Sequence, residues 1–122
     1  KLDEAGRSII NEGMTGLTTW DQGRTADLFR DFPVSVAAKT GTSEVVGSDG
    51  EIYTNAVFVC YAPADDPEIV IASILEDASY GDQSADIAYR ILCEYFGHTP
   101  THDYMGLYDD ESARLTEGFG NN

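Results

Sequence analysis

Three apolar runs that favour β-strands, at residues 34–44, 53–62 and 68–76, are joined by two short turns, and this arrangement most constrains the fold. The turn at 47–51 is rich in glycine and aspartate, which tolerate the backbone angles of tight turns. The turn at 63–67 begins and ends with proline, which cannot donate to a strand ladder. Strands joined this closely pair as antiparallel neighbours. The sequence therefore predicts a three-stranded antiparallel meander.

The middle run, residues 53–62, is apolar at both alternating sets of positions. One set is Ala56, Phe58, Cys60 and Ala62, and the other is Val57, Val59 and Tyr61. Successive side chains of a strand point to opposite faces of the sheet. We therefore expect this strand to be central and covered on both faces.

Two amphipathic segments flank the meander and predict helices at about 1–19 and 83–96. The first places one set of apolar residues near one helical face: Leu2, Ala5, Ile9, Met14 and Leu17. The second does the same before Gly97, a natural helix stop, with Ala85, Ala88, Ile91, Leu92, Tyr95 and Phe96. Residues 98–122 are polar and acidic without a sustained period, and we expect them to form a loosely held tail. The predicted fold class is α+β.

The chain is strongly acidic, with 7 Lys+Arg against 22 Asp+Glu and a net charge of −15 over 122 residues. This balance argues against binding nucleic acid, whose phosphates require a cationic surface. It argues equally against a basic patch for anionic lipid. Cys60 and Cys93 have no histidines at zinc-ligand spacing. We expect them to be buried free thiols, with a disulfide as the open alternative, and we expect no metal or cofactor.

The first β-like run ends in an unusual polar segment. Lys39 is the only lysine besides Lys1, and a glycine and small hydroxyl residues follow it. The first strand of a meander has a neighbour on one side, so its other edge can accept an extended ligand as an added strand. Gly41 would let a ligand backbone approach. From the residues alone two interpretations stay open: a binding edge, or a lysine that protects an exposed edge from aggregation.

Four blocks of the sequence carry a family resemblance. They are Asn11-Glu12-Gly13-Met14, Gly23-Arg24-Thr25-Ala26, the stretch VAAKTGTSE at 36–44 and the stretch NAVFVCYAP at 55–63. In order and spacing they are similar to the closing part of a class B (monofunctional) penicillin-binding protein transpeptidase domain. Residues 39–42 resemble its K-T-G-T motif. The resemblance covers about residues 1–97, and it departs from the family at Ala38, where glycine is commoner.

This resemblance implies a partial serine transpeptidase/β-lactamase-like fold and a role for each residue of the motif. Lys39 would help to organise proton transfer, and the backbone N–H of Thr42 would form half of an oxyanion hole. The hydroxyls of Thr40 and Thr42 would bind the carboxylate of a stem peptide ending in D-Ala-D-Ala or of a β-lactam. Gly41 would keep the edge open, and Ser43 completes the substrate-binding set.

The family's nucleophile motif is missing from the sequence, because no serine is followed by lysine three residues later. Tyr53-Thr54-Asn55 has the Tyr-x-Asn form of the second motif, but it follows Lys39 instead of preceding it, and we treat it as chance. We therefore expect residues 1–97 to be the C-terminal segment of a transpeptidase domain that is inactive alone.

Three further expectations follow from the resemblance. The segment would need the N-terminal part of its domain, and it could dimerise or swap strands when isolated. The whole protein would act on the extracytoplasmic face of a bacterial membrane, held by a helix outside this chain. The alternative function is a non-catalytic module that binds a peptide along the free edge around Lys39.

Overall fold

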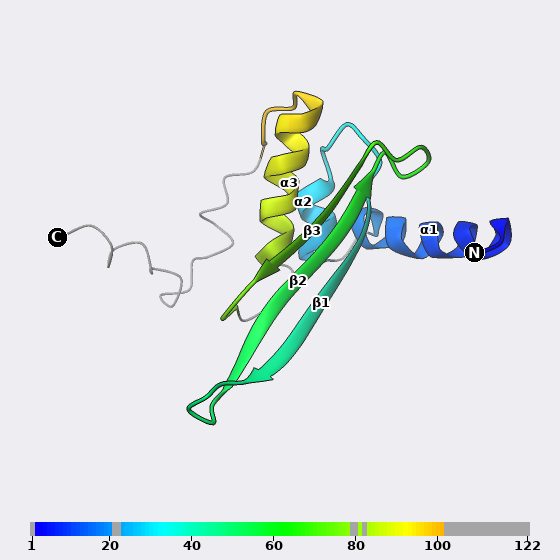
Figure 1. Ribbon diagram of the computed structural model, residues 1–122. Helices are drawn as coiled ribbons and strands as arrows, with labels where there is room; N and C mark the ends of the chain where they lie inside the picture. The colour runs from blue at the N-terminus through cyan, green and yellow to red at the C-terminus, as the bar shows by residue number, and fades with distance from the viewer. Residues whose placement is uncertain (1, 21–22, 79–80, 82, 102–122) are drawn as a thin grey trace.

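The computed structural model describes residues 2–20, 23–78, 81 and 83–101. In chain order, the elements are α1 (Glu4–Thr19), α2 (Arg24–Phe29), β1 (Ala37–Val46), β2 (Ile52–Ala62), β3 (Ile69–Leu75) and α3 (Gln83–Phe96). The strands form one antiparallel sheet in the order β1-β2-β3 (Figure 1). The predicted α+β class and meander are confirmed. Apart from residues 98–101, the predicted tail lies outside the described residues.

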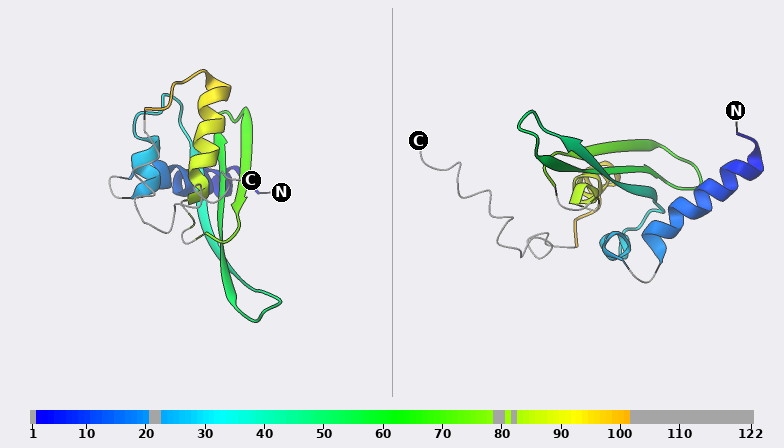
Figure 2. Two further views of the ribbon diagram at one scale, coloured as in Figure 1. Left: turned by 90° about the vertical axis from the view of Figure 1, so that its left-hand side faces the viewer. Right: turned by 90° about the horizontal axis from the view of Figure 1, so that it is seen from below.

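The hydrophobic core lies between one face of the sheet and the helices α2 and α3 (Figure 2). Phe58 of β2 is fully buried and stacks on Phe29 of α2, with ring centroids 6.3 Å apart. Tyr89 of α3 meets the same Phe29 ring edge-on at 5.5 Å. Aromatic rings bury large apolar areas, so these three side chains join both helices to the central strand.

The described residues cover the opposite face of the sheet only at one end, where Ala37, which pairs with Tyr61, is fully buried and the hydroxyl of Tyr61 donates to Asn11 of α1. Val57, Val59 and Tyr61 of β2 are only half-buried there. On β3, Val70 and Ile74 are 69% and 66% exposed. The strand is central, as expected, but the expectation that residues 53–62 are covered on both faces holds within the described residues only at the end near Tyr61. The physical reason is that α2 and α3 both pack on the same face.

Strand β1 starts at Ala37, three residues later than the sequence predicts, and runs on to Val46. The backbone just before it has hydrogen-bond partners outside the sheet. The carbonyl of Ser35 accepts from the N–H of Ala64 at 2.9 Å. The carbonyl of Val36 accepts from the hydroxyl of Thr18 at 2.6 Å. Residues 34–36 therefore connect the sheet to α1 and to the β2–β3 turn.

Helix α1 begins where Asp3 caps it, because the carboxylate of Asp3 accepts from the N–H of Gly6 at 2.7 Å. Its C-terminal half packs most closely on the rest of the chain, where Gly16 and Thr18 are buried, and in its middle Asn11 accepts from the hydroxyl of Tyr61 at 2.8 Å. The N-terminal half extends beyond the sheet (Figure 1), and Leu2 and Ile9 are 58% and 69% exposed. The apolar residues expected on one face of 1–19 do not form a buried face.

Helix α3 ends at Phe96, and Gly97 follows in a left-handed conformation with φ of 67°, as the sequence predicts. Its buried face is rotated relative to the prediction. The buried residues are Ser84, Ala85, Ala88, Tyr89, Leu92 and Cys93. Ile91 and Tyr95, which the sequence places on the packed side, are 44% and 52% exposed. Helical spacing alone is compatible with a buried face that includes Ile91 and Tyr95 or with one centred on Tyr89. Contact of α3 with β2 and β3 buries the face centred on Tyr89.

Candidate functional site

The predicted binding residues lie on an edge strand, as the sequence indicates. Within the described part of the chain, β1 pairs only with β2. Residues 39–43 lie in the first half of β1, and their outer edge has no strand beside it. Such an edge presents backbone N–H and C=O groups that an extended ligand can pair with.

The register of β1 on β2 places the side chains of the Lys-Thr-Gly-Thr motif, residues 39–42, on two different faces of the sheet. Lys39 and Gly41 lie opposite Val59 and Val57, on the open face of the sheet. Thr40 and Thr42 lie opposite Phe58 and Ala56, on the face that α3 covers. The lysine and the two threonines are therefore brought together by the edge of the sheet, which borders both faces.

Lys39 is exposed, and its Nζ donates to the backbone carbonyl of Thr40 at 2.6 Å. This hydrogen bond folds the ammonium group back along its own strand. Thr42 and Ser43 are also exposed, whereas Thr40 and Gly41 are half-buried. A positive charge and hydroxyl groups thus border one edge of a chain whose net charge is −15.

Packing within the sheet does not require glycine at position 41. A β-carbon added there would lie 3.5 Å from the Cβ of Val57, which is an ordinary van der Waals contact. Strand β2 would accept alanine at this point. The sequence analysis predicts glycine at position 41 because it lets a ligand backbone approach the free edge, and this stays a prediction.

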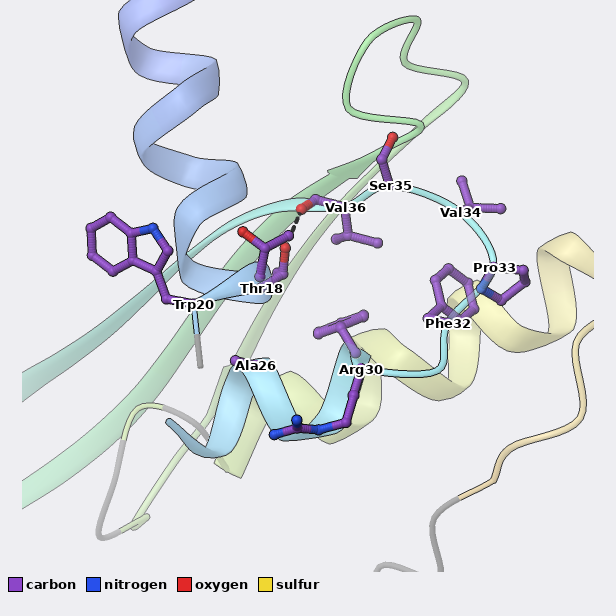
Figure 3. Close-up of a pocket in the computed structure, with 11 residues that line it drawn as sticks. Thr18, Trp20, Ala26, Arg30, Phe32, Pro33, Val34, Ser35 and Val36 are labelled. Atoms are coloured by element: carbon purple, nitrogen blue, oxygen red, sulfur yellow. Dashed lines mark hydrogen bonds between the residues drawn. The ribbon is translucent and has the colours of Figure 1, made fainter. Parts of the chain in front are cut away.

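Two hydroxyl groups that sequence reasoning missed connect the start of β1 to the rest of the chain. Thr18 of α1 bonds to the carbonyl of Val36 (dashed line in Figure 3). The hydroxyl of Ser35 accepts from the N–H of Ala64 at 3.0 Å and donates to Asp65 at 3.3 Å. These partners lie 18 to 30 residues apart along the chain, so no local pattern marks them.

Two cavities lie in the described part of the chain, and both are away from the Lys-Thr-Gly-Thr motif at 39–42. One, of about 320 Å³, lies between the end of α1, α2 and residues 33–36 (Figure 3). The other, of about 580 Å³, lies between α1 and the β2–β3 turn, beside the 2.8 Å hydrogen bond from the hydroxyl of Tyr61 to Asn11. Residues 39–43 line neither cavity. The described chain therefore presents them on an open strand edge.

The two cysteines are buried free thiols, which confirms the preferred prediction. Burial raises the pKa of Cys60 to about 12 and also raises the pKa of Cys93. A thiol acts as a nucleophile through its thiolate form. Both groups therefore stay protonated near neutral pH and are inert components of the core.

Comparison with known proteins bears on the family and the fold of this chain. Residues 4–93 match the family model described as the penicillin-binding protein transpeptidase domain. The peptidoglycan D,D-transpeptidase MrdA of Haemophilus influenzae is 30% identical over 95 residues, which cover 69% of this chain and 15% of that protein. Penicillin-binding protein 2B of Streptococcus pneumoniae serotype 2 is 38% identical over 65 residues, or 53% of this chain and 9% of that protein.

A solved structure of penicillin-binding protein 2B from Streptococcus pneumoniae strain R6 has the same fold over 84% of this chain and 17% of its own. Its TM-score is 0.67 at 27% identity. The chain therefore belongs to the penicillin-binding protein transpeptidase domain family, and its α+β fold is part of that domain. It spans about a sixth or less of the length of the relatives that it matches.

Proposed function

We propose that this chain supplies the substrate-binding strand of a peptidoglycan D,D-transpeptidase, an enzyme that cross-links cell-wall peptides by serine acyl transfer. One observation carries the proposal. In a chain that belongs to the transpeptidase family, no strand of the described residues pairs with the outer edge of β1 where the sequence reads Lys-Thr-Gly-Thr at 39–42.

In this mechanism an extended ligand adds to the edge of β1. The hydroxyls of Thr40 and Thr42 bind its terminal carboxylate, and Ser43 extends the polar edge. The backbone N–H of Thr42 stabilises the oxyanion that develops on the attacked carbonyl, and one such donor contributes roughly 3–4 kcal/mol in acyl transfer. Lys39 places a positive charge beside the reacting groups and helps to organise proton transfer.

The nucleophile comes from another part of the domain, because the chain has no serine with lysine three residues later. Acyl transfer needs nucleophile, base and oxyanion donors together, so the 122-residue chain alone is inactive. The open face of the sheet and the exposed outer side of β3 are the surfaces that the N-terminal part of the domain would cover. In isolation they would favour a homodimer or a strand swap.

The ligand of this edge is a stem peptide ending in D-Ala-D-Ala, or a β-lactam that resembles it. The net charge of −15 makes nucleic acid an unsuitable partner. A peptidoglycan substrate places the enzyme on the extracytoplasmic face of the bacterial membrane. Within the described ranges, no helix has both the length and the apolar composition to cross a membrane.

Covalent labelling with a fluorescent penicillin tests the proposal, using the longer protein that contains this chain and the rest of its domain. We expect the parent protein to label and Lys39→Ala to label about 100-fold more slowly or worse, in line with the loss of a proton-transfer group. Arg7→Ala, which removes one exposed positive charge on α1, is the matched control and should label at the parent rate.

Two results would contradict the proposal. Labelling of the isolated 122 residues would show that the nucleophile lies within them. A longer protein that does not label, but whose isolated chain binds an extended peptide through Lys39, would indicate the non-catalytic binding module instead.

A further inference from the structure

Gly81, in the loop between β3 and α3, lies directly against the motif on β1. It is buried, and a β-carbon added to it would lie 2.5 Å from the carbonyl oxygen of Gly41 and 2.9 Å from its carbonyl carbon. The same β-carbon would lie 3.0 Å from the hydroxyl oxygen of Thr42. The first two neighbours are backbone atoms and cannot rotate away. Any side chain at position 81 therefore displaces the strand or the loop.

Described residues before and after Gly81 make hydrogen bonds that connect this part of the chain to the sheet. Before Gly81, the N–H of Ala78 donates to the carbonyl of Thr54 on β2 at 2.8 Å. After it, the buried hydroxyl of Ser84 donates to the carbonyl of Gly81 at 3.1 Å. The hydroxyl of Ser73 on β3 in turn donates to the carbonyl of Ser84 at 2.9 Å. Gly81 is thus buried against β1 and linked through Ser84 to β3.

We propose that Gly81 is a positioning residue for the carboxylate-binding side of the motif. In the described chain, β1 has a strand neighbour on one side only, so contact with Gly81 is a second constraint on the position of Gly41 and Thr42. The inference rests on the proposed function, in which the Thr42 hydroxyl binds the ligand carboxylate. A side chain at position 81 moves that hydroxyl away from the carboxylate and slows acylation.

This proposal predicts a dependence on the charge of the ligand. A misplacement of about 1 Å in a reacting geometry can cost on the order of 100-fold in rate. A penicillin with a free carboxylate accepts a hydrogen bond from the Thr42 hydroxyl. The methyl ester of the same penicillin has no carboxylate to accept this bond. The rate with the acid should therefore fall much more than the rate with the ester.

The experiment compares Gly81→Ala with the parent in the longer protein, by the second-order rate of acylation with a penicillin and with its methyl ester. We expect the rate with the acid to fall about 10- to 100-fold and the rate with the ester to fall less than about threefold. Gly13→Ala is the matched control, since a β-carbon there meets nothing within 4 Å. It should leave both rates unchanged.

Ser84→Ala provides a second variant, because it removes the hydrogen bond that holds the Gly81 carbonyl while adding no bulk. We expect a smaller fall of several-fold in the ratio of acid to ester rates, and this variant carries the test if Gly81→Ala does not fold. Equal rates for parent and variant, or an equal fall for both penicillins, would overturn the inference. A parent protein that labels with neither penicillin would instead overturn the proposed function.

Discussion

The hydroxyl of Thr18, near the end of α1, donates a 2.6 Å hydrogen bond to the backbone carbonyl of Val36, the residue before β1. Thr18 is 6% exposed, so this contact is shielded from water. The bond attaches the helix to the strand that carries Lys39, three residues further on. The position of the motif is therefore tied to α1 as well as to the sheet.

We expect Thr18→Val to lower the free energy of unfolding by about 1–3 kcal/mol, because it leaves the buried Val36 carbonyl without this donor. Denaturant unfolding of the longer protein measures the change. Thr19→Val is the matched control, since the exposed Thr19 hydroxyl bonds only along its own helix, to the carbonyl of Thr15. Equal losses in the two variants would show that the bond to Val36 contributes little.

We expect alkaline pH to destabilise the fold through Cys60. Burial raises the pKa of the folded thiol from its ordinary value of 9.0 to about 12. As the pH rises above 9.0, the unfolded thiol loses its proton first, so the free energy of unfolding falls until the folded thiol also ionises near 12. The slope contributed by this group is about 1.4 kcal/mol per pH unit.

Unfolding measured between pH 8 and pH 11 checks this expectation. Cys60→Ala should show a shallower decline over that range than the parent, whatever its stability at pH 8. Parallel curves for the two proteins would mean that the Cys60 thiol ionises similarly in the folded and unfolded states.

We expect the isolated 122-residue chain to self-associate through β3. Val70 and Ile74 are 69% and 66% exposed on this outer strand, and an exposed apolar edge strand pairs readily with other chains. Light scattering should report dimers or larger species. The double variant Val70→Lys, Ile74→Lys should shift the chain towards monomer, because charged side chains on an edge strand oppose its pairing with other chains.

Ile9→Lys is the control for self-association, because Ile9 is 69% exposed on the protruding half of α1, away from the sheet. It should leave the distribution of species unchanged. A parent chain that stays monomeric at all concentrations would contradict the expectation.

The order of the strands and the limits of α3 were predictable from local signals. Turn residues at 47–51 and 63–67 mark the two reversals, and Gly97 marks the end of the last helix. The start of β1 was predicted three residues early. Val34 and Val36 suit a strand by type, but the carbonyls of Ser35 and Val36 accept hydrogen bonds from Ala64 and Thr18, which are distant in sequence.

The faces of the elements were predicted less well. Alternation shows that Val57 and Phe58 point to opposite faces of β2, but both are apolar, so their types do not tell which face is covered. The helical spacing of α3 likewise includes both Ile91 and Leu92 among the apolar positions, and only Leu92 is buried. Coverage depends on where helices dock, and docking involves residues far apart along the chain.

By itself, the sequence determined the meander, the flanking helices and the position of Lys-Thr-Gly-Thr on an edge strand, since turns and periodicity act over a few residues. The tertiary structure decided that helices cover the sheet face on which Phe58 lies, that Thr18 and Ser35 hold the start of the strand, and that Gly81 packs against Gly41 and Thr42. These relationships join segments 18 to 40 residues apart, and such distant contacts form only when the helices and the sheet pack together.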